Sequence, residues 1–131
     1  MTEPIVSTLA TYRRDGSVLL SPVWHAWRDG GVDICMGHGD VKLRHLQRDP
    51  RASLVVYDQK PPYRGLQLTG TPRVLGPAEA DYLSVLRRIA LHYVGENQGH
   101  AYADASPGTG LVVRLEPGDI RSWDFADDFG S

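Results

Sequence analysis

Short runs in which apolar and polar residues alternate dominate the first third of the chain and predict strands. Residues 5–12 mix apolar and hydroxyl side chains of good strand propensity. An Asp-Gly pair at 15–16 supplies a hairpin turn before the next run, residues 18–27. A second turn at 29–31 precedes a third run, residues 32–36. Three strands joined by tight turns predict an antiparallel meander.

Proline and glycine mark the places where these strands cannot be regular. Pro22 lies in the middle of the second strand and has no N–H for a ladder, so we expect an edge or a bulge there. Gly70 and Pro72 predict a bulge or sharp bend in a later strand, residues 64–75. Residues 59–63, just before this later strand, are too rich in proline for regular structure.

Two segments have helical rather than alternating patterns. The first is short, carries Lys42 and Arg44, and is stopped by Asp49-Pro50 before a strand at 52–57. The second is long, and we expect Gly76-Pro77 to start it, because proline is favoured at the first helical position. Its apolar residues fall on one stripe, which consists of Tyr82, Leu86, Ile89 and Tyr93.

The end of the chain returns to strands. The long helix should end near Gly95, and residues 96–110 are predicted to be a loop or one irregular helical turn. Residues 111–115 form a continuous apolar strand, and 120–123 extend the sheet. The acidic end after them is expected to be loose.

About six strands, one short and one long helix predict a mainly β protein with some α (α+β), built as a small closed or half-open barrel. Little room is left inside such a barrel, so a sizeable ligand belongs on its surface, in a groove between two copies. Aromatic residues are enriched at interfaces, and the chain has a supply of them for this purpose: Trp24, Trp27, Tyr63 and Trp123.

Composition limits the class of protein. With 131 residues and 41% apolar content, we expect one soluble domain over residues 1–131. No apolar run is long enough to span a membrane and no signal segment opens the chain. A single cysteine, Cys35, excludes an internal disulfide and fits a cytoplasmic location; it lies in an apolar strand, where we expect an inert thiol.

The distribution of charge favours a small anionic ligand over nucleic acid. Residues 1–115 carry 13 Lys/Arg and 11 Asp/Glu, whereas residues 116–131 carry one Arg and five acids. A nucleic-acid duplex usually needs a larger basic surface than this. The five histidines have no spacing typical of zinc ligands, and no serine or cysteine has the partners that nucleophilic catalysis needs.

The candidate chemistry lies around the start of the short helix. Residues 36–39 are Met-Gly-His-Gly, Asp40 follows, and Lys42 stands in the first helical turn. Backbone N–H groups at a helix start and a nearby lysine can bind an anion such as a phosphate. A solvated lysine on a wet helix face is the alternative, and His38, between two glycines, should be exposed near any ligand.

Several of these segments resemble one known family. The segments TLATYRRDGSVLLSPVW, VKLRHLQRDPRASLVV and PPYRGLQLTGTPRVL look like the split β-barrel flavin and deazaflavin proteins related to pyridoxamine 5'-phosphate oxidase. The resemblance covers residues 5–76 well and is closest to the branch that uses the deazaflavin coenzyme F-420. It implies a homodimer with a cofactor in each of two grooves shared by both subunits.

The resemblance also implies cofactor-binding positions. Ser21, Pro22, Val23 and Trp24 should line the flavin ring with backbone groups, and Met36, Gly37, His38 and Gly39 should follow the ring toward the phosphate. Lys42 matches the lysine that meets the phosphate, and Tyr63 and Arg64 fall where the family places groups near the cofactor.

Asp40 departs from the family pattern, which commonly has arginine or serine there, just as His45 stands in place of an asparagine. If Asp40 caps its own helix, it competes with a phosphate for the N–H donors and repels it. The resemblance implies an oxidoreductase that transfers hydride between coenzyme F-420 and a small organic substrate, and the residues themselves indicate no metal site and no identifiable catalytic side chain. The alternatives are the same fold using FMN, and a non-catalytic flavin carrier.

Overall fold

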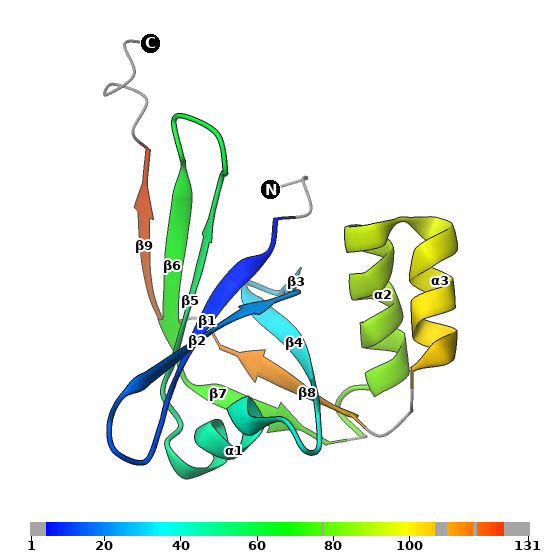
Figure 1. The fold of residues 1–131 in the computed structure, drawn as a ribbon, viewed down its shortest axis with the longest axis horizontal. Helices are drawn as coiled ribbons and strands as arrows, with labels where there is room; N and C mark the ends of the chain where they lie inside the picture. The colour runs from blue at the N-terminus through cyan, green and yellow to red at the C-terminus, as the bar shows by residue number, and fades with distance from the viewer. Residues whose placement is uncertain (1–4, 77, 107–109, 117, 125–131) are drawn as a thin grey trace.

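The computed structural model describes residues 5–76, 78–106, 110–116 and 118–124. These residues form nine strands and three helices (Figure 1). The strands are β1 (Ser7–Tyr12), β2 (Val18–Val23), β3 (Ala26–Arg28), β4 (Gly31–Gly37), β5 (Ala52–Tyr57), β6 (Gly65–Gly70), β7 (Pro72–Leu75), β8 (Gly110–Leu115) and β9 (Asp119–Trp123). The helices are α1 (Val41–Arg48), α2 (Tyr82–Val94) and α3 (Glu96–Ala105).

The strands form two antiparallel sheets that curl into a barrel. One sheet has the order β2-β1-β5-β6-β9 and the other the order β3-β4-β8-β7. The predicted α+β split barrel is therefore confirmed, with more and shorter strands than expected. The prediction that the first strands form one antiparallel meander is wrong. β2 pairs with β1 in the first sheet, whereas β3 pairs with β4 in the second.

Two of the predicted strands are bent and pass from one sheet to the other. The run 18–27 breaks at Trp24 and His25, just after Pro22, and β2 lies at the edge of its sheet. The run 64–75 breaks at Thr71, between Gly70 and Pro72. Proline therefore stands where the sequence predicted an edge and a bend, since it cannot supply a ladder hydrogen bond.

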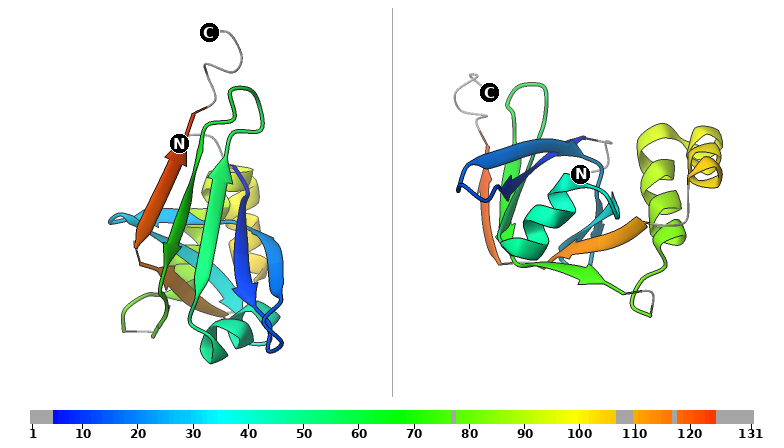
Figure 2. Two further views of the ribbon diagram at one scale, coloured as in Figure 1. Left: turned by 90° about the vertical axis from the view of Figure 1, so that its left-hand side faces the viewer. Right: turned by 60° about the horizontal axis from the view of Figure 1, so that its bottom comes forward.

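The core lies between the sheets and is closed at one end by α1 (Figure 2). Alternate residues of β1 and β5 point inward, and Leu9, Leu54 and Val56 are almost fully buried. From α1, Leu43 and Leu46 join the same cluster, so the short helix covers the barrel end with its apolar face. None of the described helices is long and apolar enough to cross a membrane.

The α2–α3 pair packs to one side of the barrel, with α2 against β4 and β8 (Figures 1 and 2). The predicted helix start was too early: α2 begins at Tyr82 after Asp81, whose side chain accepts a hydrogen bond from the Ser84 N–H at 3.1 Å. Pro77 lies outside the described residues. Leu86 and Ile89 of the predicted stripe are buried, and α2 ends at Gly95 as expected.

A third helix, α3, covers residues 96–105, where the sequence predicted a loop or one irregular helical turn. Gly95 has a φ of 85°, which favours glycine and turns the chain sharply between the two helices. Gly99 lies against the α2 backbone, since a Cβ there would stand 2.8 Å from atoms of Leu91. The glycines that suggested a loop thus permit a tight helix pair. The predicted loose acidic end lies largely outside the described residues.

Candidate functional site

The site predicted from the sequence starts at the turn between β4 and α1. The Asp40 N–H donates to the Gly37 carbonyl at 3.1 Å, which closes a tight turn. Gly37, His38 and Gly39 are exposed, and a Cβ added at either glycine would meet no atom within 4 Å. The turn is therefore open to the approach of a ligand.

Asp40 holds both the helix start and the lysine after it. Its Oδ1 accepts the Lys42 backbone N–H at 2.9 Å, and its Oδ2 lies 2.9 Å from Lys42 Nζ. The next two N–H groups, of Leu43 and Arg44, donate to the Asp40 carbonyl at 3.1 and 3.3 Å. These three N–H groups thus have acceptors within the chain, and the capping by Asp40 that the sequence analysis considered is present.

The buried face of α1 fixes the position of Lys42. His45, one turn after Lys42, is buried, and its Nδ1 lies 3.0 Å from the Thr11 hydroxyl on β1. Buried polar side chains need such partners, and this pair ties the helix to β1.

The arginines near α1 are more constrained than the sequence suggested. Arg48 donates to the Tyr12 carbonyl at 2.6 Å. Arg51 pairs with both carboxylate oxygens of Asp49, at 2.8 and 2.6 Å, and its guanidinium lies 4.3 Å from the centre of the Tyr12 ring. Within the part of the chain that the structure describes, exposed Arg44 has no such ion pair.

The residues predicted to line a flavin ring are a mixture of open and packed side chains. β2 pairs only with β1 among the described strands, so the backbone edge at Ser21 and Pro22 can meet a ligand. Val23 is buried, and the Trp24 ring stacks on Tyr93 of α2 with centroids 5.0 Å apart. The Trp24 ring is therefore occupied within its own chain.

The remaining predicted positions do not gather around Lys42. Met36 is buried in the core, so only its backbone is available. Tyr63 and Arg64 lie in the β5–β6 connection, where Arg64 Nε is 3.6 Å from Asp58 and Trp123 Nε1 donates to the Tyr63 carbonyl at 2.9 Å. Arg64 borders a cavity of about 630 Å³ that does not include Lys42.

A group of residues that the sequence did not single out surrounds His25. The Ser7 and Tyr93 hydroxyl oxygens lie 2.9 and 3.0 Å from His25 Nδ1. Burial, aided by the charge of nearby His92, lowers the pKa of His25 from 6.5 to about 4. The sequence carried no signal for this group, because its members are far apart along the chain.

The His25 environment predicts a pH dependence of stability. A folded-state pKa of about 4 against an ordinary value of 6.5 means that the unfolded chain takes up the proton first as the pH falls. The contribution of His25 to stability is therefore complete above pH 6.5 and is lost between 6.5 and 4. We expect the free energy of unfolding, measured with urea at intervals of pH, to rise less steeply with pH in this window for His25→Gln than for the wild type. His38→Gln, at the exposed turn, should show the wild-type dependence on pH. Parallel curves for all three proteins would contradict the assignment.

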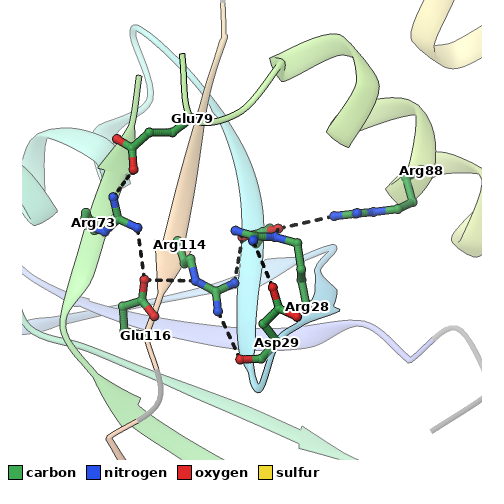
Figure 3. A network of polar contacts seen from close by, with 8 residues as sticks. Arg28, Asp29, Arg73, Glu79, Arg88, Arg114 and Glu116 are labelled. Atoms are coloured by element: carbon green, nitrogen blue, oxygen red, sulfur yellow. Dashed lines mark hydrogen bonds and ion pairs between the residues drawn. The ribbon is translucent and has the colours of Figure 1, made fainter. Parts of the chain in front are cut away.

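A polar cluster around Asp33 crosses the other sheet (Figure 3). Asp33 is almost fully buried and receives three guanidinium groups, from Arg28 at 2.8 Å, Arg88 at 3.3 Å and Arg114 at 3.4 Å. Arg114 also pairs with Glu116 at 3.0 Å. The cluster joins β3, β4, β8 and α2, and its ion pairs within the chain indicate a structural role.

Neither a metal centre nor an activated thiol is present in the described part of the molecule. No three His, Cys, Asp or Glu side chains there are grouped so as to hold a metal ion. Burial raises the pKa of Cys35 to about 12, so its thiol stays protonated at neutral pH.

Two antiparallel sheets that share bent strands, with a helix across one barrel end, define the class of split β-barrel proteins. A family model described as pyridoxamine 5'-phosphate oxidase matches residues 1–124. The chain therefore belongs to the pyridoxamine 5'-phosphate oxidase family, and the resemblance noted in the sequence is confirmed.

Solved structures agree with this assignment. A conserved hypothetical protein from Mycobacterium tuberculosis has a TM-score of 0.76 and 25% identity over 97% of this chain and 81% of its own. An F420 reductase has a TM-score of 0.70 and 21% identity, and the match covers 92% of this chain and 91% of that protein. A FAD-binding protein from Mesorhizobium loti has a TM-score of 0.65 and 17% identity, and the match covers 92% of this chain and 86% of that protein. No curated protein sequence matches the chain. The similarity to the last two structures shows the fold alone. Their names mention different cofactors, F420 and FAD, so the fold does not determine which cofactor is bound.

Proposed function

We propose that the protein is a flavin-type oxidoreductase that uses coenzyme F-420 to exchange hydride with a small organic substrate. The observation that carries this proposal is the open turn at residues 37–39 leading to Lys42, in a chain of this family. Among the solved relatives, a protein named F420 reductase has the same fold over almost all of both chains.

The residues at this turn fit a phosphodiester if Lys42 exchanges its partner. Lys42 and Asp40 are each about one-fifth exposed, at 19% and 22% of their side chains. Both side chains still reach water, so the pair is held less strongly than a fully buried one, and a phosphate oxygen can replace the Asp40 carboxylate. Lys42 would then hold the phosphate and Arg44 a more distant anion, while the β2 edge at Ser21 and Pro22 would offer backbone groups to the ring.

The cofactor itself supplies the hydride chemistry when bound, and the protein supplies its position. Here α1 is fixed to β1 through His45 and Thr11, so Lys42 is presented from a firm element. No acid or base is assigned to the reaction.

The Asp40–Lys42 pair also supports the choice between cofactors. FMN ends in a phosphate dianion, and one lysine already paired with an acid is a poor clamp for it. Coenzyme F-420 has a phosphodiester with a single charge and an anionic tail beyond it, which suits Lys42 followed by exposed Arg44. The same pair favours the non-catalytic carrier as the second candidate, since weak binding is compatible with delivery of a cofactor.

Cofactor choice is tested by fluorescence-quenching titrations of the protein with coenzyme F-420 and with FMN. We expect tighter binding of coenzyme F-420. A preference for FMN of tenfold or more, on the order of 1.4 kcal/mol, would reverse the choice. Turnover with reduced coenzyme F-420 and a panel of organic acceptors separates the enzyme from the carrier, because a carrier binds the cofactor without oxidising it.

We also propose that the protein is a homodimer, joined through the outer face of strands β2, β1, β5 and β6 of the five-stranded sheet; β9, at the far edge, turns charged Asp119 and Arg121 to the same face. The residues that β1, β2, β5 and β6 turn outward carry no charged group; they are Thr8, Ala10, Tyr12, Val18, Leu20, Pro22, Ser53, Val55, Tyr57, Gln67 and Thr69. Leu20 is 65% exposed on β2, whose outer edge has no partner strand among the described residues. An uncharged face with an open edge is suited to contact with a second copy, and such a contact would complete a groove beside the β2 edge.

The dimer is tested by sedimentation equilibrium at micromolar concentration. We expect the dimer mass for the wild type and the monomer mass for Leu20→Arg, because an unpaired arginine would be buried in the contact. Leu83→Arg places the same charge on an exposed leucine of α2 and should leave the dimer intact. A monomer mass for the wild type would refute the proposal.

A further inference from the structure

A second cavity, of about 270 Å³, opens between the start of β1, the β3 strand and α2. None of the residues predicted to bind the cofactor lines it. Pockets for drug-sized ligands have volumes of roughly 300–1,000 Å³, so this cavity is too small for a flavin nucleotide and fits a smaller molecule.

The wall of this cavity combines apolar and basic side chains. The apolar part is formed by Ile5, Ala26, Trp27 and Val56. The polar part is formed by His25, Arg88 and His92, and none of the lining residues that the structure describes is a carboxylate. Ligand sites typically have such an apolar body with a few polar groups that fix orientation.

Arg88 is the cation best placed to meet an anion there. Among the described residues its one ion pair is the 3.3 Å contact with Asp33, a carboxylate that Arg28 approaches more closely, at 2.8 Å. The Arg88 side chain is 51% exposed, and Figure 3 shows it reaching from α2 to the edge of the cluster. A guanidinium has five N–H donors in a planar fork, so Arg88 can keep Asp33 and still bind a carboxylate.

The hydrogen bonds of His25 define its tautomer. The Ser7 hydroxyl donates to the Val23 carbonyl at 3.1 Å, and the Tyr93 hydroxyl donates to the Ile5 carbonyl at 2.9 Å. Both hydroxyl oxygens can therefore only accept from His25 Nδ1, which must carry the ring proton. A ligand that contacts His25 would meet the unprotonated Nε2, a hydrogen-bond acceptor that stays neutral.

We propose that this cavity binds a small organic acid, with its carboxylate at Arg88 and its aliphatic or aromatic body against Trp27 and Ile5. A free phosphate suits the site less well, because the apolar wall offers nothing to its remaining oxygens. The proposal concerns a site separate from Lys42 and does not depend on the cofactor.

Calorimetric titration with benzoate and hexanoate, and with benzamide and inorganic phosphate as matched probes, tests this proposal. We expect the two acids to bind and benzamide to bind at least about tenfold more weakly, since it lacks the charge that Arg88 meets. Arg88→Gln should weaken benzoate binding by about tenfold or more. The matched control is Arg87→Gln, which removes the neighbouring cation of α2, paired with Asp104 at 2.6 Å, and should bind benzoate as the wild type does.

A second variant tests the cavity without changing any charge. Ala26→Leu fills the space beside β3 and should abolish acid binding, and its thermal unfolding shows whether the fold is retained. Lys42→Ala should leave benzoate binding unchanged, which keeps this test independent of the cofactor proposal. Equal binding of benzoate and benzamide, binding of phosphate alone, unchanged binding in Arg88→Gln or Ala26→Leu, or no binding of either acid would each overturn the assignment.

Discussion

Asp33→Asn should unfold far more easily than the wild type, with a loss of about 3–5 kcal/mol in the free energy of unfolding. Asp33 is 1% exposed and is the carboxylate toward which Arg28, Arg88 and Arg114 converge. Asparagine keeps the shape but removes the charge, so Arg114, whose side chain is 6% exposed, loses a buried anionic partner. Urea unfolding at pH 7 measures the loss.

Asp29→Asn is the matched control for this experiment. Asp29 pairs with the same Arg28, at 3.5 Å, but its side chain is 82% exposed. Its φ of 49° is a conformation that asparagine adopts readily, so the backbone is not disturbed. We expect a change within about 0.5 kcal/mol, as for ordinary surface substitutions. If Asp33→Asn also fell within this range, the cluster would contribute little to stability.

Lys42→Ala should weaken the binding of coenzyme F-420 by about ten- to hundredfold, because a charge-assisted contact is commonly worth roughly 1.5–3 kcal/mol. Stability without the cofactor should fall by about 1 kcal/mol, since among the described residues the one ion pair lost is that with Asp40, which still reaches water. Fluorescence titration and urea unfolding of the same samples separate the two effects.

Asp40→Ser should act in the opposite direction. Serine retains an oxygen that can cap α1, but it removes the carboxylate that holds Lys42 Nζ at 2.9 Å. The lysine then meets the cofactor without competition, and affinity rises. Arg87→Gln serves as the control for loss of a cation elsewhere, in the α2–α3 pair, and should bind as the wild type does. Equal affinities for Lys42→Ala, Asp40→Ser and the wild type would place the phosphate away from α1.

Local rules predicted much of the strand and helix content. Asp49-Pro50 ends α1, Asp15-Gly16 closes the first hairpin, and Gly70 with Pro72 bends the chain, because each acts on its own backbone. The exchange of strands between sheets could not be predicted in this way. It depends on the pairing of β4 and of β7 with β8, which lies much later in the chain, and no local pattern encodes this pairing.

The missed features have the same origin. The composition of α3 gave only a weak helical pattern, and the helix is held by the close approach of Gly99 to Leu91 in α2. Asp33 sits inside an apolar run, and its three arginines come from three other elements. Lys42 was identified from the sequence, but its pairing with Asp40 is a matter of side-chain geometry.

The central claim is that the chain carries a flavin-type cofactor at the start of α1. The most direct test is gel filtration of the protein mixed with a slight excess of coenzyme F-420, followed by the absorbance spectrum of the protein peak. The account predicts that the visible band of the cofactor elutes with the wild-type protein, at about one cofactor per subunit, and is depleted from the Lys42→Ala peak. A wild-type peak without that band, or an undiminished band with Lys42→Ala, would contradict it.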